Sequence, residues 1–230
     1  MIQVRGLTKI IASGSRRVEI LKGIDLDVPK GQFIAIVGPS GSGKSTLLGL
    51  LAGLDTPTAG SIRLAGEEIT GLDEDRLAVL RGRTIGFVFQ SYHLIPTLTA
   101  EENVLLPREL IGGPDGASRA RELLDRVGLL DRRDHYPVQL SGGAQPRVAL
   151  ARAFMLRPPV LMADEPTGNL DSATGHMVLE LLAALNREEG TTLVLVTHDA
   201  ELTGSAQRVV TIKDGRIVSD EKPGDRRDVS

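Results

Sequence analysis

Apolar and polar residues alternate along the first third of the chain and again near its end, as they do in half-buried β-strands. The clearest alternating run is VEILKGIDLDV at residues 18–28, and AGSIRLAGEEI at residues 59–69 has the same character. Near the end, RVVTIKDGRIVSD at residues 208–220 carries Asp214-Gly215 where a hairpin would turn. These segments predict antiparallel β-structure.

Three other runs are continuously apolar until they reach a glycine or a polar residue, which is typical of buried parallel strands. They are FIAIVG at residues 33–38, VLMADEP at 160–166 and TTLVLVTHD at 191–199. Helical patterns follow the first two, in STLLGLLAGL at 45–54 and in GHMVLELLAALNREEG at 175–190, where Gly190 ends the helix. Strands that alternate with helices predict an α/β fold with a mostly parallel sheet.

The middle of the chain has helical periodicity. In SRARELLDRVGLL at residues 118–130, the spacing places Leu123, Leu124, Val127 and Leu130 on one side of a helix. We expect one domain over 1–230, with a core and an antiparallel β subdomain at about 1–90 and 157–220. A helical subdomain is inserted at about 91–156, and 221–230 form a polar tail.

Composition narrows the class of protein. The chain has 230 residues, a net charge of −3, 3% aromatic residues and no cysteine. Proteins that coat nucleic acid are usually basic, and single-strand binders need aromatic stacking surfaces, so we expect no nucleic-acid partner. Disulfides are excluded. No secretion signal or membrane-length apolar run is visible, so any membrane role is expected to come through a partner.

The stretch GPSGSGKST fits the phosphate-binding pattern G-x-x-x-x-G-K-[ST] and lies between a predicted strand and a predicted helix. Glycines let backbone N–H groups turn inward to cradle phosphates, and the helix N-terminus adds partial positive charge. Lys44 can reach the β- and γ-phosphates, and the Ser45 hydroxyl can ligate Mg²⁺. A chance glycine-rich turn is disfavoured because strand, glycines, Lys and Ser are in register. The predicted nucleotide contacts are Gly38, Pro39, Ser40, Gly41, Ser42, Gly43, Lys44, Ser45 and Thr46.

Polar residues stand at the ends of the other predicted strands. Asp164 and Glu165 end VLMADEP, Gln90 ends TIGFVFQ and His198 ends TTLVLVTH. Ligands bind outside the carboxyl ends of parallel strands, so these side chains can face one site. Asp164 can hold Mg²⁺, and Glu165 can polarise the attacking water. Each residue alone has a structural alternative, as a solvated strand end or a core histidine.

The stretch LSGGAQPRVALARA, residues 140–153, places two glycines before a good helix. Ser141 is a natural N-cap, and Gly142 and Gly143 leave the backbone open to a phosphate from another molecule. The alternative is an ordinary capped helix, but glycines weaken a helix by nearly 1 kcal/mol each. Two phosphate-binding helix starts and one P-loop predict that two copies share two nucleotides across a dimer.

At this point the chain resembles an ABC-type ATPase subunit over nearly its full length. It has a Walker A motif at Gly38–Thr46, a Q-loop glutamine at Gln90, the signature LSGG at 140–143 and a Walker B pair at Asp164 and Glu165. A D-loop GNLD at 168–171 and a switch histidine, His198, complete the set. IGFVFQSYHLIPTLTAEENV and ADEPTGNLDSATG resemble the LolD/MacB branch, and SYHLIPTLTAEENVLLP resembles its YbbA-like members.

The resemblance implies a P-loop NTPase core of RecA type that hydrolyses Mg-ATP in a head-to-tail homodimer. It assigns catalytic roles to Lys44, Gln90, Glu165 and His198, and Mg²⁺ contacts to Ser45, Gln90 and Asp164. In trans, Ser141, Gly142 and Gly143 would contact the γ-phosphate, and Asp171 would couple the two sites. Closure would drive a membrane permease from the cytoplasmic face of the membrane, with hydrophobic or lipid-like cargo.

Two departures from the family pattern carry predictions. The family usually stacks an aromatic residue on adenine near position 11, where this chain has Ile11. We expect an aliphatic adenine surface with Val18, and weak discrimination of ATP from GTP; Arg17 or Val18 could compensate from the same loop. Ala144 and Pro146 stand where polar residues are usual. Pro146 crowds the preceding turn, so we predict a regular helix from about Gln145 and an extended turn at Gly142 and Gly143.

The segment SYHLIPTL, Ser91–Leu98, is apolar for a loop. It either docks a cytoplasmic helix of the permease or covers the helical subdomain with Leu94, Ile95 and Leu98, and we favour docking. Two other functions compete with the transporter subunit. A soluble ABC-type ATPase of DNA repair or ribosomes would need a coiled-coil insertion or a second cassette, and a P-loop kinase would not need LSGG or a D-loop.

Overall fold

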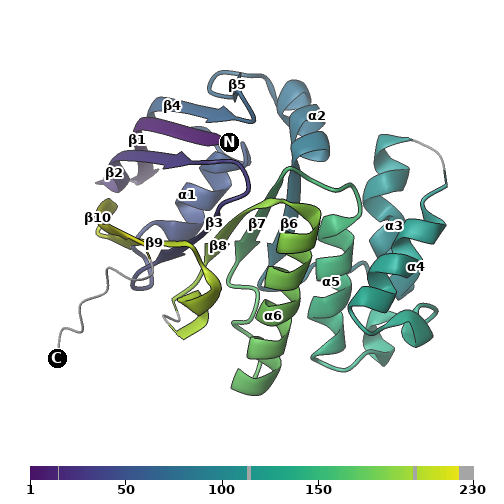
Figure 1. The fold of residues 1–230 in the computed structure, drawn as a ribbon. Helices are drawn as coiled ribbons and strands as arrows, with labels where there is room; N and C mark the ends of the chain where they lie inside the picture. Colours follow the sequence, from purple (N-terminus) through teal and green to yellow (C-terminus); the bar gives the residue numbers. More distant parts are fainter. Residues whose placement is uncertain (15, 113–114, 199–200, 223–230) are drawn as a thin grey trace. The chain divides into compact units, whose positions relative to one another are not determined.

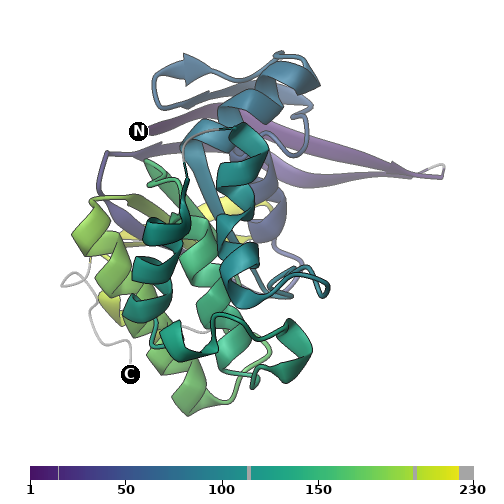
Figure 2. The same cartoon turned by 90° about the vertical axis from the view of Figure 1, so that its right-hand side faces the viewer.

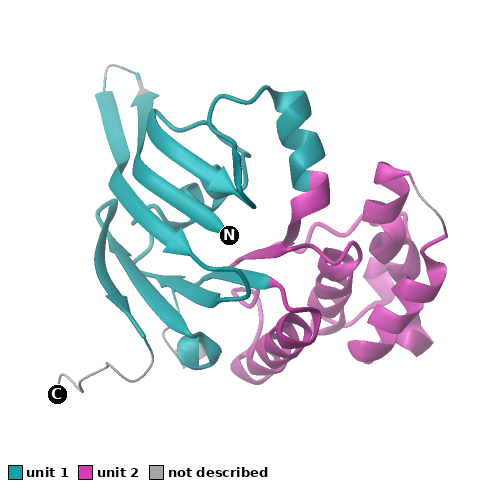
Figure 3. Ribbon diagram, turned by 45° about the horizontal axis from the view of Figure 1, so that its top comes forward, with its two compact units in different colours: residues 1–81, 192–230 teal, residues 82–191 magenta. Residues whose placement is uncertain are grey.

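The computed structural model describes residues 1–14, 16–112, 115–198 and 201–222, and the predicted polar tail lies outside them from residue 223. The chain divides into two compact units (Figure 3). Unit 1 comprises residues 1–81 and 192–230, and unit 2 comprises residues 82–191. Unit 2 therefore contains the whole of the predicted helical segment 91–156, one strand before it, and one strand and one helix after it.

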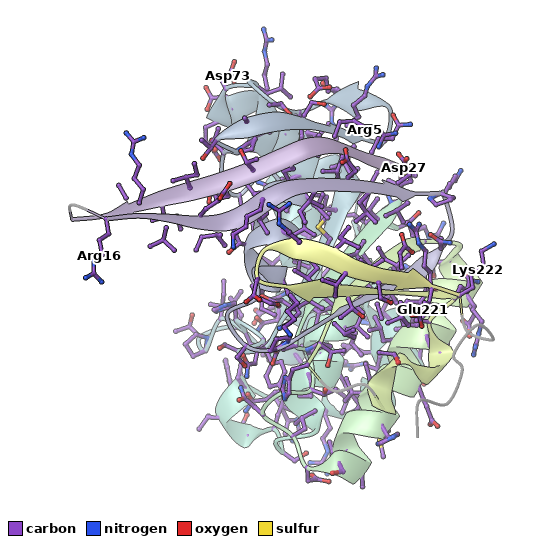
Figure 4. The ribbon with its side chains drawn as sticks, turned by 90° about the vertical axis from the view of Figure 1, so that its left-hand side faces the viewer. Arg5, Arg16, Asp27, Asp73, Glu221 and Lys222 are labelled. Atoms are coloured by element: carbon purple, nitrogen blue, oxygen red, sulfur yellow. The ribbon has the colours of Figure 1, made fainter. Side chains whose placement is uncertain are left out.

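An antiparallel sheet in unit 1 has the strand order β2-β1-β4-β5. Its strands are β1 (Ile2–Ser13), β2 (Arg16–Val28), β4 (Ala59–Leu64) and β5 (Glu67–Glu68). The alternating pattern places Leu21, Ile24, Leu26 and Val28 inward. Arg5 and Asp27 form an ion pair of 2.8 Å across β1 and β2, and Arg16 lies near the tip of this hairpin (Figure 4).

The parallel strands of unit 1 carry the predicted phosphate loop. β3 (Phe33–Val37) pairs in parallel with β8 (Thr192–Val196) and β9 (Arg208–Lys213), and β9 turns into antiparallel β10 (Arg216–Glu221). Every residue of β8 is buried, as its unbroken apolar run predicts. Helix α1 (Lys44–Leu51) follows β3, and a short 3-10 helix spans Glu201–Ser205.

Helix α2 (Glu74–Thr84) is not among the predicted elements (Figure 1). Its residues 74–81 belong to unit 1 and residues 82–84 to unit 2. Its N-terminus is held by Asp73, whose carboxylate accepts a hydrogen bond of 2.9 Å from the Arg76 N–H. Leu77 is its buried apolar residue, and a Cβ atom on Gly53 would lie 2.9 Å from Leu77 Cδ2. The contact at Gly53 anchors a helix that is otherwise largely polar.

Unit 2 contains two parallel strands, β6 (Ile85–Phe89) and β7 (Val160–Asp164). Helices α3 (Ala100–Ile111), α4 (Ala117–Arg126) and α5 (Ala144–Phe154) lie side by side in both views of Figures 1 and 2. Two 3-10 turns span Leu130–Arg132 and Pro137–Gln139, and α6 (Ser172–Glu189) follows β7. Val148–Leu150 on α5 and Val160–Ala163 on β7 are fully buried and form much of the core.

The predicted apolar face of α4 is correct for Leu123, Leu124 and Val127, which are buried, and wrong for Leu130. The helix ends at Arg126, because Gly128 takes a left-handed φ of 68° and its N–H bonds to the Asp125 carbonyl at 2.8 Å. The chain therefore leaves the helix before Leu130, which is half-buried in the next turn.

An ion-pair cluster joins α4 to the end of α6. The Glu189 carboxylate, 12% exposed, lies 2.8 Å from Arg119 and 2.6 Å from Arg126. Arg157 lies 3.8 Å from its second oxygen. Burial raises the pKa of Glu189, but the hydrogen bonds from Arg119 and Arg126 outweigh it and hold that pKa below its ordinary value.

Candidate functional site

The phosphate loop of unit 1 has the predicted context: it follows β3, which ends at Val37, and runs into α1, which begins at Lys44. Gly38, Gly41 and Gly43 have φ values of 147°, 77° and 103°, which disfavour any residue with a Cβ. The glycines of the motif therefore fold the loop into a conformation that few other residues could adopt.

Two buried polar groups lie in this loop. The Lys44 ammonium donates to the carbonyls of Gly38 at 2.9 Å and Pro39 at 3.1 Å, and the residue is only 5% exposed. The Ser42 hydroxyl is buried and has no hydrogen-bond partner among the residues that the structure describes. A buried hydroxyl without a partner costs about 1–3 kcal/mol, which an oxygen of a bound ligand can recover. These donors fit the phosphates of a nucleotide.

The strand ends of unit 2 bring their polar residues to one edge. Phe89 at the end of β6 pairs with Asp164 at the end of β7, so Gln90 and Glu165 leave the two strands at the same level. Glu165 takes a left-handed φ of 45°, which turns the chain sharply after the strand. Asp164 and Glu165 are half-buried, and Gln90 is exposed.

Asn169 in the D-loop is a residue of this edge that the motif assignments passed over. Its amide donates to the Gln90 carbonyl at 3.1 Å, and the Gln90 amide donates to Asn169 Oδ1 at 3.5 Å. A Cβ on Gly168 would lie 2.7 Å from Gln90 Nε2, so the glycine makes room for the glutamine. The Q-loop and the D-loop are thus in direct contact within unit 2.

The predicted site residues divide between the two units. Gly38–Thr46 and His198 belong to unit 1, whereas Gln90, the Walker B pair and the signature belong to unit 2. His198 is exposed and follows β8 by two residues. No group of three or more His, Cys, Asp or Glu side chains close enough to hold a metal ion occurs in the described ranges.

The start of the signature helix differs from the prediction in two respects. Helix α5 begins at Ala144, and its N-cap residue is Gly143, without a hydrogen bond from a capping side chain, so Ser141 is not the N-cap. Gly143 is helical, with φ −79° and ψ −14°, so the predicted extended turn is wrong. The Ser141 carbonyl accepts the N–H groups of Ala144 at 2.9 Å and Gln145 at 3.3 Å and closes the turn.

The position of Pro146 explains this geometry. Proline stands third in α5, within the first turn, where backbone N–H groups have no partner inside a helix. Its missing N–H therefore removes no helical bond, and the helix begins at Ala144, one residue before the predicted start near Gln145. The Arg147 guanidinium donates hydrogen bonds to the carbonyls of Gly143 at 3.0 Å and Val127 at 2.9 Å, and these bonds stabilise the turn. Ser141 and Gly142 remain exposed.

Asp171 has a structural task besides its predicted one. It is the N-cap of α6 and accepts hydrogen bonds from the N–H and the hydroxyl of Thr174, at 3.0 Å and 2.7 Å. These two bonds lower the pKa of the Asp171 carboxyl. The cap fixes the end of the D-loop, and thereby the segment that follows the Walker B strand.

The predicted adenine surface is an aliphatic pair on the β1–β2 hairpin. Ile11 and Val18 are cross-strand partners and are 45% and 46% exposed. Exposed aliphatic side chains on a hairpin leave apolar surface that a flat base can cover. Ile10 is also exposed, at 37%, but as the preceding residue of β1 it points to the opposite face of the hairpin.

The segment Ser91–Leu98 is held from two sides. The fully buried Asn103 accepts from the Ile95 N–H at 2.8 Å and donates to the carbonyls of Ile95 and Leu98 at 3.1 Å and 3.0 Å. Arg152 donates to the carbonyls of Tyr92 and His93 at 2.5 Å and 2.7 Å, and burial lowers the pKa of Arg152. The loop is therefore ordered although it lies outside regular structure.

A groove in unit 2 lies beside this segment. Its volume is about 320 Å³ and its lining is mostly apolar, from Phe87 and Phe89 on β6, Leu106 and Leu110 on α3, and Arg152 on α5. Of the segment itself, Tyr92 is buried, which raises the pKa of its hydroxyl, while Leu94 and Leu98 are half-buried and Ile95 is 36% exposed. The segment thus combines inward-facing residues with an apolar outer surface.

In the described part of the chain, no helix is both long and apolar enough to cross a membrane.

Comparison with known proteins identifies the family. The family model for ABC transporters matches residues 21–168. The chain is 51% identical to the ABC transporter ATP-binding protein YbbA of Escherichia coli K12, over 94% of this chain and 96% of that protein. It is 50% identical to the lipoprotein-releasing system ATP-binding protein LolD of Geobacter metallireducens, over 96% and 99%.

A longer relative and a solved structure extend the comparison. The chain is 52% identical to the macrolide export ATP-binding/permease protein MacB of Nitrosomonas europaea and spans 34% of that protein's length. The dimeric ATP-binding cassette MJ0796, solved with ADP and phosphate, superposes with a TM-score of 0.89 at 42% identity, over 96% of this chain and 98% of that one. From the matched model, the identities and the superposition, the chain belongs to the ABC transporter family, whose ATP-binding cassettes bind ATP with Mg²⁺ and hydrolyse it.

Proposed function

We propose that this chain is the motor subunit of a transporter and that its phosphate loop grips the ATP that drives it. The observation that carries the proposal is the unpartnered Ser42 hydroxyl, which is buried in the same loop of left-handed glycines as the Lys44 side chain. Lys44 neutralises the β- and γ-phosphates, while Ile11 and Val18 cover the adenine.

The remaining strand-end residues complete the chemistry in this proposal. Ser45, Gln90 and Asp164 hold Mg²⁺, which offsets the negative charge of the phosphates. Glu165 accepts a proton from the attacking water, and His198 contacts the γ-phosphate. The pairing of β6 with β7 supports a shared role for Gln90 and Glu165, because it brings both to the same edge.

The signature belongs to the second nucleotide site of a head-to-tail homodimer. Ser141, Gly142 and Gly143 contact the γ-phosphate that the other copy binds, and Asp171 couples the two sites. The exposure of Ser141 and Gly142 supports this role, and so does the dimeric state of the solved MJ0796 cassette.

The membrane partner in this proposal is a permease, because the MacB relative is by name an ATP-binding/permease protein. A cytoplasmic helix of the permease docks on Ser91–Leu98 and in the groove beside it. The apolar lining and the exposed Ile95 suit an amphipathic helix. The chain then works at the cytoplasmic face of the membrane, on hydrophobic or lipid-like cargo.

The substitution Glu165→Gln tests the proposal that this chain is an ATP-driven transporter subunit. It removes the carboxylate that would accept a proton from water and keeps the volume of the side chain. We therefore expect MgATP to drive the variant into dimers that persist because hydrolysis stalls. Size-exclusion chromatography with light scattering measures this directly. Glu180→Gln, an exposed site on the same unit, is the matched control and stays as the wild type. A Glu165→Gln variant that remains monomeric in saturating MgATP would contradict the proposal.

A further inference from the structure

We propose that the turn of the β9–β10 hairpin, Asp214-Gly215, positions the phosphate loop, and that Gly215 is a positioning residue for nucleotide binding. The inference rests on the proposed function of the loop Gly38–Thr46. The hairpin comes from the opposite end of the sequence, about 170 residues after the loop that it contacts. Both belong to unit 1.

The first contact is a hydrogen bond from the hairpin turn to the loop. The Gly215 N–H donates to the Ser42 carbonyl at 3.1 Å. A trans peptide is planar, with its carbonyl and N–H on opposite sides. A Ser42 carbonyl held toward the hairpin therefore turns the N–H of Gly43 away from it. One bond thus fixes the orientation of a peptide in the middle of the loop, beside the buried Ser42 hydroxyl.

The second contact lies at the start of the loop. A Cβ atom on Gly38 would lie 2.0 Å from the carbonyl oxygen of Ile212, a residue of β9. Backbone therefore touches backbone here, and no side chain fits without moving the strand or the loop. The hairpin contacts the loop at Gly38 and again at Ser42, so it braces the curve between these residues.

The turn is itself anchored on β2. The Lys22 N–H donates to the Gly215 carbonyl at 2.9 Å, and the Arg216 guanidinium donates to the Lys22 carbonyl at 3.1 Å. Gly215 has a φ of 77°, and a Cβ on it would lie 2.4 Å from the Ile20 carbonyl oxygen. A side chain at position 215 would push the turn away from β2, and thereby away from Ser42.

The test compares two glycines of similar conformation. Gly215→Ala is expected to weaken MgADP binding about tenfold, measured by titration calorimetry on the full chain, because it displaces the Ser42 peptide. Gly66→Ala is the matched control: Gly66 has a φ of 90° at the β4–β5 turn, and a Cβ there would meet no atom of the described residues within 4 Å. Gly66→Ala introduces the same backbone strain but does not displace the Ser42 peptide, so we expect its affinity for MgADP to stay within about twofold of wild type. Equal affinities for the two folded variants would overturn the proposal.

A second pair decides the question if Gly215→Ala does not fold. Arg216→Ala removes an exposed side chain that anchors the turn, and we expect about threefold weaker MgADP binding. Arg63→Ala removes the corresponding hairpin contact, to the Gly66 carbonyl at 3.4 Å, and should leave binding unchanged. If neither Arg216→Ala nor Arg63→Ala changes MgADP binding, the proposal that the hairpin positions the phosphate loop is overturned. Lys44→Ala separates the two hypotheses, since binding that survives it would refute the proposed nucleotide site itself.

Discussion

Asn103 is expected to be the side chain that keeps the proposed docking segment in place. It is fully buried, accepts from the Ile95 N–H and donates to carbonyls of Ile95, Leu98 and Thr99 at 2.9–3.1 Å. One accepted bond and two amide hydrogens amount to about three net hydrogen bonds, each contributing about 0.5–1.5 kcal/mol. Asn103→Ala should therefore lower the free energy of unfolding by about 3 kcal/mol.

Urea unfolding measures this loss, and hydrogen exchange localises it, because the Ile95 amide should lose protection before the core does. Asn186→Ala is the control: Asn186 is also nearly buried, and its amide donates to the Thr191 carbonyl, away from the docking segment. It should leave the exchange of Ile95 unchanged. An Asn103→Ala variant within about 0.5 kcal/mol of wild type, with Ile95 still protected, would refute the reasoning.

Three further predictions concern the ion-pair cluster, the adenine surface and the signature turn. Glu189→Gln should cost about 1–3 kcal/mol at pH 7, because the half-buried Arg119 and Arg126 lose the carboxylate that they share and keep only their more exposed partners, Glu122 and Glu188. Because the pKa of Glu189 is lowered in the folded state, its contribution to the free energy of unfolding is present above the ordinary glutamate pKa and is lost as pH falls through the folded pKa. The urea midpoints of the wild type and Glu189→Gln should therefore converge below about pH 4. A difference between the two midpoints that stays constant with pH would contradict this prediction. The steady-state constants of the wild type for ATP and for GTP should be comparable. Ile11→Tyr should tighten ATP binding by about 2- to 10-fold, because its ring can stack on adenine. A strong preference of the wild type for ATP would contradict this prediction. Gly142→Ala should leave the free energy of unfolding, measured in urea, within about 0.5 kcal/mol of wild type. It should nevertheless abolish the MgATP-dependent dimer of Glu165→Gln, and a dimer that persists would show that Gly142 is not part of the dimer interface.

Local patterns were sufficient for the elements that carry the phosphate loop. The family and the α/β fold class predicted from the sequence are confirmed. Strands β3, β7 and β8 form where continuous apolar runs predict them, because burial on both faces demands such runs. Helix α2 escaped prediction because Leu77 is its main buried residue, so its sequence lacks apolar periodicity.

Contacts between distant residues could not be predicted in the same way. Asn103, Arg152 and Asn169 hold backbone carbonyls of segments that follow β6, and nothing in their own neighbourhoods marks them. The turn before Pro146 was predicted only in part. The helix begins at Ala144, within one residue of the predicted start near Gln145, but Gly143 takes helical dihedral angles where an extended turn was predicted. The bonds that close this turn come from the Ser141 carbonyl and from Arg147, which the motif pattern does not mark.

The glycines of this chain serve two kinds of purpose, and the structure separates them. At Gly38 and Gly215, a Cβ would strike a backbone carbonyl at 2.0 Å and 2.4 Å, and at Gly143 it would lie 2.9 Å from a methyl group of Thr174, so packing inside the chain requires glycine. Gly142 has no such reason: its φ is not left-handed, and a Cβ there would meet no described atom within 4 Å. A glycine that neither conformation nor packing requires still carries the entropy cost of a flexible backbone. We propose that its compensation comes from another molecule, the phosphate of the partner's nucleotide, whose close approach a Cβ would block.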